Sequence, residues 1–238
     1  MTVLIVDDNP IGVGPMAQAI TARLGHEVVL LTEVQQVTND IVLAAKPELA
    51  LVDLSFRGTS RSGLDVLVFL AEASPSTALV LFTQGDDAVA ELMRVAWEAL
   101  PVATALSKSL PLDLFVEALQ RVLADGEAPP DPVLQPLLPA SRSPWRMAAG
   151  FARLVPHAGH AKLWQALIDA GTDPSYSDLH RLTGLKVNTL RNYREQLLPE
   201  LGLHGLANPT MCQMQVFATR CRPLLQPYIA AGLQGSSR

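Results

Sequence analysis

Cysteine and long apolar runs are both scarce in this sequence of 238 residues. The two cysteines, Cys212 and Cys221, lack the spacing of a metal site, so we expect free thiols in a reducing compartment. No stretch approaches the roughly 18 consecutive apolar residues that a membrane helix needs. The N-terminus has neither the basic region nor the cleavage site of a signal peptide. These absences predict a cytoplasmic protein that does not enter a membrane.

Catalytic signatures are missing too. The sequence has no glycine-rich phosphate-binding loop, no nucleophile elbow and no zinc spacing, so we do not expect a freestanding enzyme. Hydrophobic residues make up 49% of the chain, which is enough for packed cores. Residues 1–145 have 8 Lys and Arg against 18 Asp and Glu, whereas residues 146–238 have 10 against 5. The length and this asymmetry favour two domains, the second with an anionic partner.

Strand and helix patterns alternate five times in the first half of the chain. The expected strands are apolar runs at 2–6, 27–31, 48–54, 77–83 and 102–107. The expected helices lie at about 15–24, 34–45, 63–73, 86–98 and 110–124. Short continuous apolar runs are typical of strands that are buried on both faces of a parallel sheet. The first half therefore predicts a doubly wound α/β domain with right-handed crossovers.

Closely spaced prolines interrupt this pattern between residues 125 and 144, where we expect a semi-extended linker. The linker has apolar side chains that can dock on a neighbour: Val133, Leu134, Leu137 and Leu138. Helical patterns follow at about 145–154, 159–170, 177–182, 187–198 and 209–219. We therefore predict an α/β domain at 1–124, a linker at 125–144 and an all-α domain at 145–238.

Polar side chains stand at the ends of four expected strands. They are Asp7 and Asp8, then Asp53, Thr83 and Lys108. The carboxyl ends of parallel strands meet at one edge of the sheet, where open α/β sheets bind ligands. Two carboxylates about 4 Å apart repel each other by about 4 kcal/mol. A divalent cation relieves this repulsion, and Mg²⁺ suits a half-open site with oxygen ligands. One aspartate can then attack a phosphoryl group while Thr83 and Lys108 contact its oxygens.

Residues 1–124 resemble the receiver domain of bacterial two-component response regulators, a flavodoxin-like (βα)5 fold, at all five of these positions. The resemblance implies phosphorylation of Asp53 by a sensor histidine kinase, with Thr83 as the switch hydroxyl and Lys108 as the phosphate-sensing lysine. It also implies a set of Mg²⁺ ligands: Asp7, Asp8, Asp53 and the backbone carbonyl of Ser55.

Two positions depart from the usual receiver pattern. Receivers usually have Tyr or Phe three residues before the lysine, where this chain has Ala105. They mostly have a small residue after the threonine, where this chain has Gln84. The aromatic part of the switch is therefore absent, and a signal must leave through backbone or helix shifts. A pseudo-receiver locked in one state is the alternative that these residues leave open.

The second half contains a helix, a glycine turn and a second helix at about 177–198. Ser177 is expected to cap the first helix, and Gly184 permits the sharp turn of a helix-turn-helix. The inward stripe of the second helix consists of Leu190, Leu197 and Leu201. Pro199 is expected to end or kink this helix. The arrangement predicts a motif that presents its second helix to a partner.

Polar side chains on this motif favour double-stranded DNA as the partner. The candidate DNA contacts are Arg181, Lys186, Asn188, Thr189, Arg191, Asn192 and Arg194. Arg suits bidentate contact to guanine and Asn to adenine, whereas further basic residues position the phosphates.

The stretch from Asp178 to Leu203 resembles the DNA-binding domain of the LuxR/NarL group. The matching motifs are Gly184-Leu185, Thr189-Leu190-Arg191 and Leu201-Gly202-Leu203. This resemblance makes 209–219 a dimerisation helix that exposes Met211, Met214 or Val216. The whole chain is then interpreted as a Mg²⁺-dependent response regulator that binds DNA as a homodimer and regulates transcription. The alternative is a receiver whose helical domain binds a protein partner instead of DNA.

Overall fold

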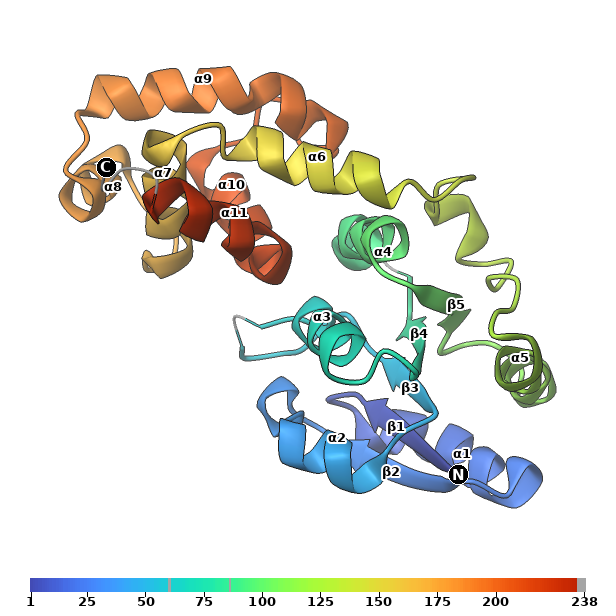
Figure 1. Cartoon of the computed structure of the whole chain (residues 1–238). Helices are drawn as coiled ribbons and strands as arrows, with labels where there is room; N and C mark the ends of the chain where they lie inside the picture. The colour runs from blue at the N-terminus through green and yellow to red at the C-terminus, as the bar shows by residue number, and fades with distance from the viewer. Residues whose placement is uncertain (60, 86, 235–238) are drawn as a thin grey trace. The chain divides into compact units, whose positions relative to one another are not determined.

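A computed structural model describes residues 1–59, 61–85 and 87–234 of the chain. The chain divides into two compact units, Met1–Arg142 and Ser143–Arg238. The first unit is a parallel sheet with helices on both faces, and the second consists of helices in its described part (Figure 1). Among the described residues, no helix combines the length and the apolar character needed to span a bilayer.

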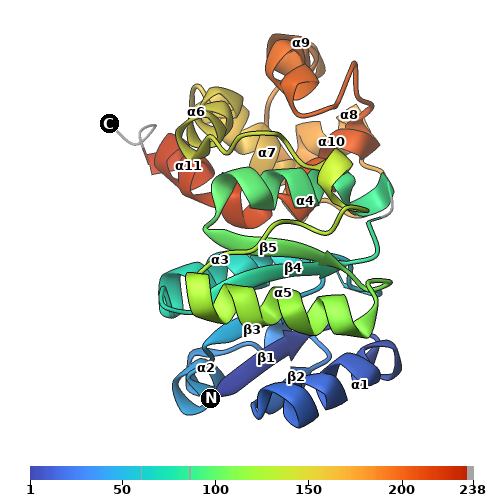
Figure 2. The ribbon, with the colours of Figure 1, turned by 90° about the vertical axis from the view of Figure 1, so that its right-hand side faces the viewer.

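Five parallel strands form the sheet of the first unit, in the order β2-β1-β3-β4-β5. They are β1 (Thr2–Val6), β2 (Glu27–Leu31), β3 (Leu49–Val52), β4 (Ala78–Thr83) and β5 (Val102–Ser107). Helices cover both faces of the sheet (Figure 2), which is why the three central strands and β5 are nearly continuous apolar runs. This strand order is that of the flavodoxin-like fold, so the predicted fold class is confirmed.

Four α-helices lie between successive strands, and a fifth follows β5. They are α1 (Pro10–Ala19), α2 (Asn39–Ala45), α3 (Gly63–Ala73), α4 (Asp87–Ala99) and α5 (Leu112–Asp125). The prediction that the first helix starts at residue 15 was wrong, because the Asn9 side chain accepts from the Gly12 amide and caps the helix earlier. Similarly, Thr38 caps α2, so that helix begins later than predicted. The predicted start of the fourth helix, residue 86, lies outside the described residues.

The proline-rich segment after α5 packs on the first unit, and we refer to residues 127–142 as the strap. Gly126 ends α5 with a left-handed φ of 83°, which turns the chain back along the sheet. Leu134 of the strap is fully buried, whereas its neighbour Val133 is 60% exposed. The strap therefore belongs to the first compact unit, and the boundary between the units falls after Arg142.

Six helices are described in the second unit. They are α6 (Pro144–Leu154), α7 (Ala158–Asp169), α8 (Tyr176–Thr183), α9 (Val187–Leu203), α10 (Met211–Arg220) and α11 (Arg222–Gln234). The sequence analysis missed α11, which contains Pro223 and Pro227. This helix nevertheless buries Leu225 and Ile229 and packs along α7. Burial against α7 thus outweighs the weak helical signal of its sequence.

The helix-turn-helix consists of α8, a turn at Gly184 and α9. Gly184 adopts a left-handed φ of 70°, as the predicted turn requires. The predicted cap was wrong: Ser175, not Ser177, accepts from the Asp178 amide, and Asp178 accepts from the Ser175 amide in return.

Two further predictions for the second unit are corrected in part: Pro199 was expected to end or kink α9, and Met211, Met214 or Val216 were expected to be exposed on α10. Pro199 does not end α9, which continues to Leu203, because this proline lies on the exposed side where water can satisfy the freed carbonyl. On α10, Met211 and Met214 are buried in the unit, and only Val216 is exposed, at 43%. The apolar surface that α10 offers to a second copy is therefore smaller than predicted.

Gly63 allows α3 to approach the backbone of Asp53 closely. A Cβ atom at residue 63 would lie 1.8 Å from the Asp53 carbonyl oxygen. We expect Gly63→Ala to lower the free energy of unfolding by about 2 kcal/mol or more, because this rigid backbone must shift. The control is Gly14→Ala, whose Cβ meets open space inside α1, and it should stabilise the protein slightly. Equal denaturant midpoints for the two variants would contradict this account.

Candidate functional site

Three aspartates meet at the carboxyl edge of the sheet. Asp7 and Asp8 directly follow β1 and Asp53 directly follows β3, and these two strands are neighbours. One carboxylate oxygen from each aspartate lies within 4.8 Å of the others. Asp7 is fully buried and Asp53 is 4% exposed, whereas Asp8 is half-buried. The structure therefore brings together the three acids that the sequence places at strand ends.

Lys108, which follows β5, reaches into this acidic cluster. Its Nζ atom lies 2.7 Å from Asp7 Oδ2 and 2.8 Å from Asp53 Oδ2. Only the contact with Asp53 has hydrogen-bond geometry, so Asp7 Oδ2 is buried without a hydrogen-bond donor among the described residues. One ammonium group thus contacts two of the three clustered carboxylates, and the cluster keeps an excess of negative charge.

Backbone amides fix the carboxylates in place. The Leu54 amide donates to Asp53 Oδ1 at 2.8 Å, and the Asn9 amide donates to Asp7 Oδ1 at 2.9 Å. The Arg57 amide donates to Asp8 Oδ2 at 2.9 Å, which ties the loop after β3 to the end of β1. Because these donors belong to the main chain, the acids are held by the fold itself and not by flexible side chains.

The protonation of the cluster reflects its burial and its charges. Burial raises the pKa of Asp53 above its ordinary value, against the lowering effect of Lys108 and with a contribution from Asp7 in the raising direction. Burial acts to lower the pKa of Lys108, but the contacts with Asp53 and Asp7 outweigh it and raise that pKa. Lys108 is therefore firmly protonated, and a cation that displaces it from Asp53 must compete with this ion pair.

Thr83 and Ser55 lie at the same edge of the sheet as the cluster, Thr83 at the end of β4 and Ser55 shortly after β3. Thr83 ends β4, is almost fully buried, and pairs in register with Ser107, and its carbonyl accepts from the Lys108 amide at 3.0 Å. Gln84, the next residue, is exposed. The Ser55 amide donates toward the Asp53 carboxylate, and the Ser55 carbonyl stays a predicted metal ligand.

The donor set of this cluster fits a hard divalent cation. It offers carboxylate oxygens, and the half-buried Asp8 leaves one side open to water. Asp7 Oδ2 is buried, and its counter-charge among the described residues is the Lys108 ammonium at 2.7 Å, which it shares with Asp53. Mg²⁺ takes one or two carboxylates and keeps several waters, and therefore suits such a half-open site. The residues that can hold it are Asp7, Asp8 and Asp53.

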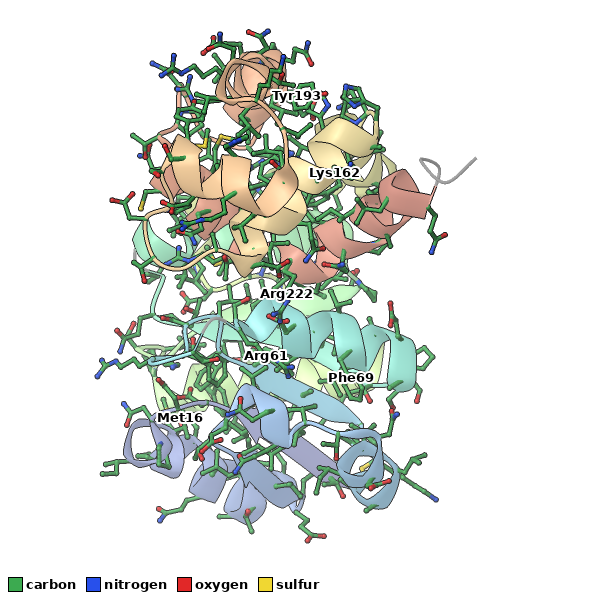
Figure 3. The ribbon with its side chains drawn as sticks, turned by 90° about the vertical axis from the view of Figure 1, so that its left-hand side faces the viewer. Met16, Arg61, Phe69, Lys162, Tyr193 and Arg222 are labelled. Carbon is green, nitrogen blue, oxygen red and sulfur yellow. The ribbon has the colours of Figure 1, made fainter. Side chains whose placement is uncertain are left out.

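The helix-turn-helix of the second unit presents a polar face. The side chains of Lys186, Asn188, Arg191 and Asn192 are exposed, and Thr189 is half-buried. The Arg191 guanidinium lies 5.4 Å from the ring centroid of Tyr176, which supports it on α8. The opposite face of α9 is anchored by three buried leucines and by Tyr193 (labelled in Figure 3). The Tyr193 ring packs on the rings of His157 and His160.

Two predicted DNA contacts are already engaged within the protein. Arg194 is only 16% exposed and donates to the Pro209 carbonyl, to Asn208 and to Glu195. It thereby fastens the loop between α9 and α10. Arg181 is exposed but pairs with Asp178 on its own helix. No pattern in the sequence indicated the partners of Arg194, because they lie in an irregular loop after the helix.

Asp131 is a site residue that the sequence analysis missed. This strap carboxylate is 4% exposed and accepts from the Ser107 amide at 3.1 Å, next to Lys108 in the chain. It also accepts from the Val133 amide at 2.8 Å. An aspartate between two prolines is common in exposed turns, so its position in the sequence did not indicate burial.

Comparisons with known proteins reveal a likeness of fold. No protein-family model and no curated protein sequence matches the chain. The fold is similar to that of a solved complex of the two-component response regulator RcsB with DNA, which is 15% identical and has a TM-score of 0.53. That match covers 92% of this chain and 98% of the other.

Two further solved structures show the same likeness. A structure of two RcsB dimers bound to two parallel DNAs is 13% identical over 92% of this chain and 98% of that one, with a TM-score of 0.51. The RcsB response regulator of Salmonella typhimurium is 16% identical over 92% of this chain and 99% of that one, with a TM-score of 0.50. These likenesses confirm the predicted combination of a flavodoxin-like unit with a helix-turn-helix unit.

Replacing Lys108 with methionine tests the charge balance of the cluster. We expect Lys108→Met to bind Mg²⁺ about tenfold more tightly, since a positive charge no longer competes with the ion for Asp7 and Asp53. The control is Lys162→Met, which removes the same charge from the exposed surface of α7 and should leave the affinity unchanged. Calorimetric titration with Mg²⁺ measures both, and weaker binding by Lys108→Met would contradict the assignment.

Proposed function

We propose that this protein is a cytoplasmic response regulator that accepts a phosphoryl group on Asp53 and controls DNA binding by its helical unit. The observation that carries the proposal is the contact of Lys108 with both Asp7 and Asp53 inside a cluster of three carboxylates. A buried acid that has both a cation site and a fixed ammonium group beside it is suited to accept a phosphoryl group.

The residues of the cluster divide the work. Asp53 Oδ2 attacks phosphorus, and the bond from phosphorus to the leaving group, an imidazole of a sensor histidine kinase or a carboxylate of acetyl phosphate, breaks. Lys108 then moves its contact from Asp53 to a phosphoryl oxygen, and the Thr83 hydroxyl donates to another. Mg²⁺ bound by Asp7, Asp8, Asp53 and the Ser55 carbonyl would neutralise charge on the phosphoryl group.

Duplex DNA is the proposed ligand of the helical unit. The exposed residues Asn188, Arg191 and Asn192 on one face of α9 suit base edges in the major groove. Lys186 and Thr189 suit backbone phosphates, as does Arg181 once it leaves Asp178. We leave Arg194 out of this set because its guanidinium is used inside the fold. A homodimer would read two half-sites, as helix-turn-helix proteins do.

Phosphorylation of Asp53 is tested by intact mass. Incubation with acetyl phosphate and Mg²⁺ should add one phosphoryl group, and chelation of the metal should prevent it. Asp53→Asn should abolish the addition, because the amide cannot act as the nucleophile. Asp113→Asn is the matched control: this α5 side chain is 87% exposed and pairs only with Arg23 in the described structure, so the variant should be modified normally. A phosphorylated Asp53→Asn protein would contradict the proposed acceptor.

DNA binding is tested by enriching random duplexes on the purified full-length protein, with and without acetyl phosphate. Against an enriched duplex, Arg191→Ala should lose about 1–3 kcal/mol of binding free energy and relax the sequence preference at the base that Arg191 contacts. Arg121→Ala removes one exposed positive charge from α5 and should bind normally.

Two outcomes of this experiment would contradict the proposal. Failure to retain any duplex would favour the alternative in which the helical unit binds a protein partner. Duplex binding that Asp53→Asn leaves unaltered under acetyl phosphate would favour a pseudo-receiver locked in one state.

A further inference from the structure

The strap lies along the free edge of the sheet. Strand β5 ends the sheet, and the strap runs beside it and on toward α4 (Figure 2). The Ala128 amide donates to the Ala103 carbonyl at 3.1 Å, and the Asp131 amide donates to the Ala105 carbonyl at 2.8 Å. The Thr104 hydroxyl donates to the Pro129 carbonyl at 3.0 Å. The strap therefore takes up hydrogen-bonding groups that an edge strand would otherwise leave to water.

The strap is also fixed at the site end of β5. Asp131 accepts from the Ser107 amide, directly before Lys108, and its carboxylate is almost fully buried. Ala105 is fully buried beneath this segment, at the position where receivers usually have an aromatic residue. The backbone of the strap thus contacts Ala105. The side chain of this residue is too small to change rotamer when the pocket changes.

Leu134 connects the strap to the loop that leaves Thr83. Gly85, two residues after Thr83, has a left-handed φ of 75°. A Cβ atom at residue 85 would lie 2.3 Å from Leu134 Cδ2, so the leucine packs directly against the backbone of this glycine. Leu134 is fully buried there. A shift of a few tenths of an ångström in the loop therefore reaches this side chain directly.

The far end of the strap leads straight into the helical unit. The Arg142 guanidinium stacks over the Trp97 ring of α4, 3.7 Å from its centroid. Helix α6 begins at Pro144, so only Ser143 separates the docked strap from the helices of the second unit. An undocked strap would instead be a tether of about 50 Å when fully extended. Docking of the strap thus decides how long the connection between the units is.

We propose that the strap is a latch, docked when Asp53 is unmodified and released when Asp53 is phosphorylated; this inference rests on the proposed function. Movement of the Thr83 hydroxyl toward a phosphoryl oxygen draws the loop at Gly85 away from Leu134. Opening a gap at so close a contact forfeits the packing energy of the leucine, and Pro129, Pro130 and Pro132 have no amide hydrogens with which to complete a hydrogen-bond ladder on β5. Release then lengthens the tether of the helical unit.

Hydrogen exchange of the full-length protein tests the latch. With acetyl phosphate and Mg²⁺, the amides of Ala128, Asp131 and Leu134 should exchange on the order of tenfold faster than without them. In the unmodified protein, Leu134→Ala should give the same acceleration. Val133→Ala truncates the exposed neighbour in the same strap and should leave the exchange unchanged. The amides of β1 and β3, central strands of the same unit, should be unaffected in both variants, which shows that the first unit is folded.

The phosphoryl content of the same samples, measured by intact mass, separates two kinds of failure. Absence of the phosphoryl group overturns the proposed function, and the latch with it. Full phosphorylation with unchanged or slower exchange at Ala128, Asp131 and Leu134 overturns the latch alone. Equal exchange in Leu134→Ala and Val133→Ala also overturns it, because the Gly85 contact would then not hold the strap.

Discussion

The contact of the Lys108 ammonium with Asp7 and Asp53 is the interaction on which the first unit depends. Burying carboxylates side by side without a cation costs several kcal/mol, and Lys108 offsets part of this cost in the absence of metal. Because the contact also raises the pKa of Lys108, its charge is present throughout the neutral range. In the proposed reaction the same pair restrains Asp53, because Lys108 must leave Asp53 for a phosphoryl oxygen once the bond to phosphorus forms. The contact between Lys108 Nζ and Asp53 Oδ2 therefore stabilises the unmodified protein, and the same contact would have to break for Asp53 to be phosphorylated as proposed.

The strands that carry this site could be predicted because burial on both faces of a parallel sheet demands short, continuous apolar runs. The polar residue after each run then indicated the functional edge, and the structure does bring Asp7, Asp8 and Asp53 together. Helix boundaries were less accessible, since a local hydrogen bond decides them. Asn9 starts α1 before its glycines, and Thr38 delays α2. Helix α11 was not predicted from the sequence, because its packing on α7 stabilises it and its own composition does not.

The helical unit shows a different limit of sequence reasoning. Counting along a helix correctly separated the buried Leu190, Leu197 and Leu201 from the exposed Arg191 and its neighbours. It did not reveal that Arg194 turns to the Asn208 and Pro209 loop, because a contact across an irregular loop leaves no periodic signal. The buried methionines of α10 were misjudged for the same reason: helical periodicity gives the direction of a side chain but not what covers it.

For the strap, one feature could be predicted from the sequence and another could not. Its proline content also explains why it can be released in the proposed latch. Its apolar residues indicated that the strap packs against a neighbouring surface. Only the fold could show that Leu134 packs against the backbone of Gly85. Prolines 129, 130 and 132 have no amide hydrogen, so the strap cannot become a sixth strand with a full ladder. Its hydrogen bonds each contribute about 1 kcal/mol, and the buried leucine about 2 kcal/mol. In the proposed latch, a docked state held by a few kcal/mol is populated at rest, and phosphorylation of Asp53, which moves the loop at Gly85, is expected to reverse it.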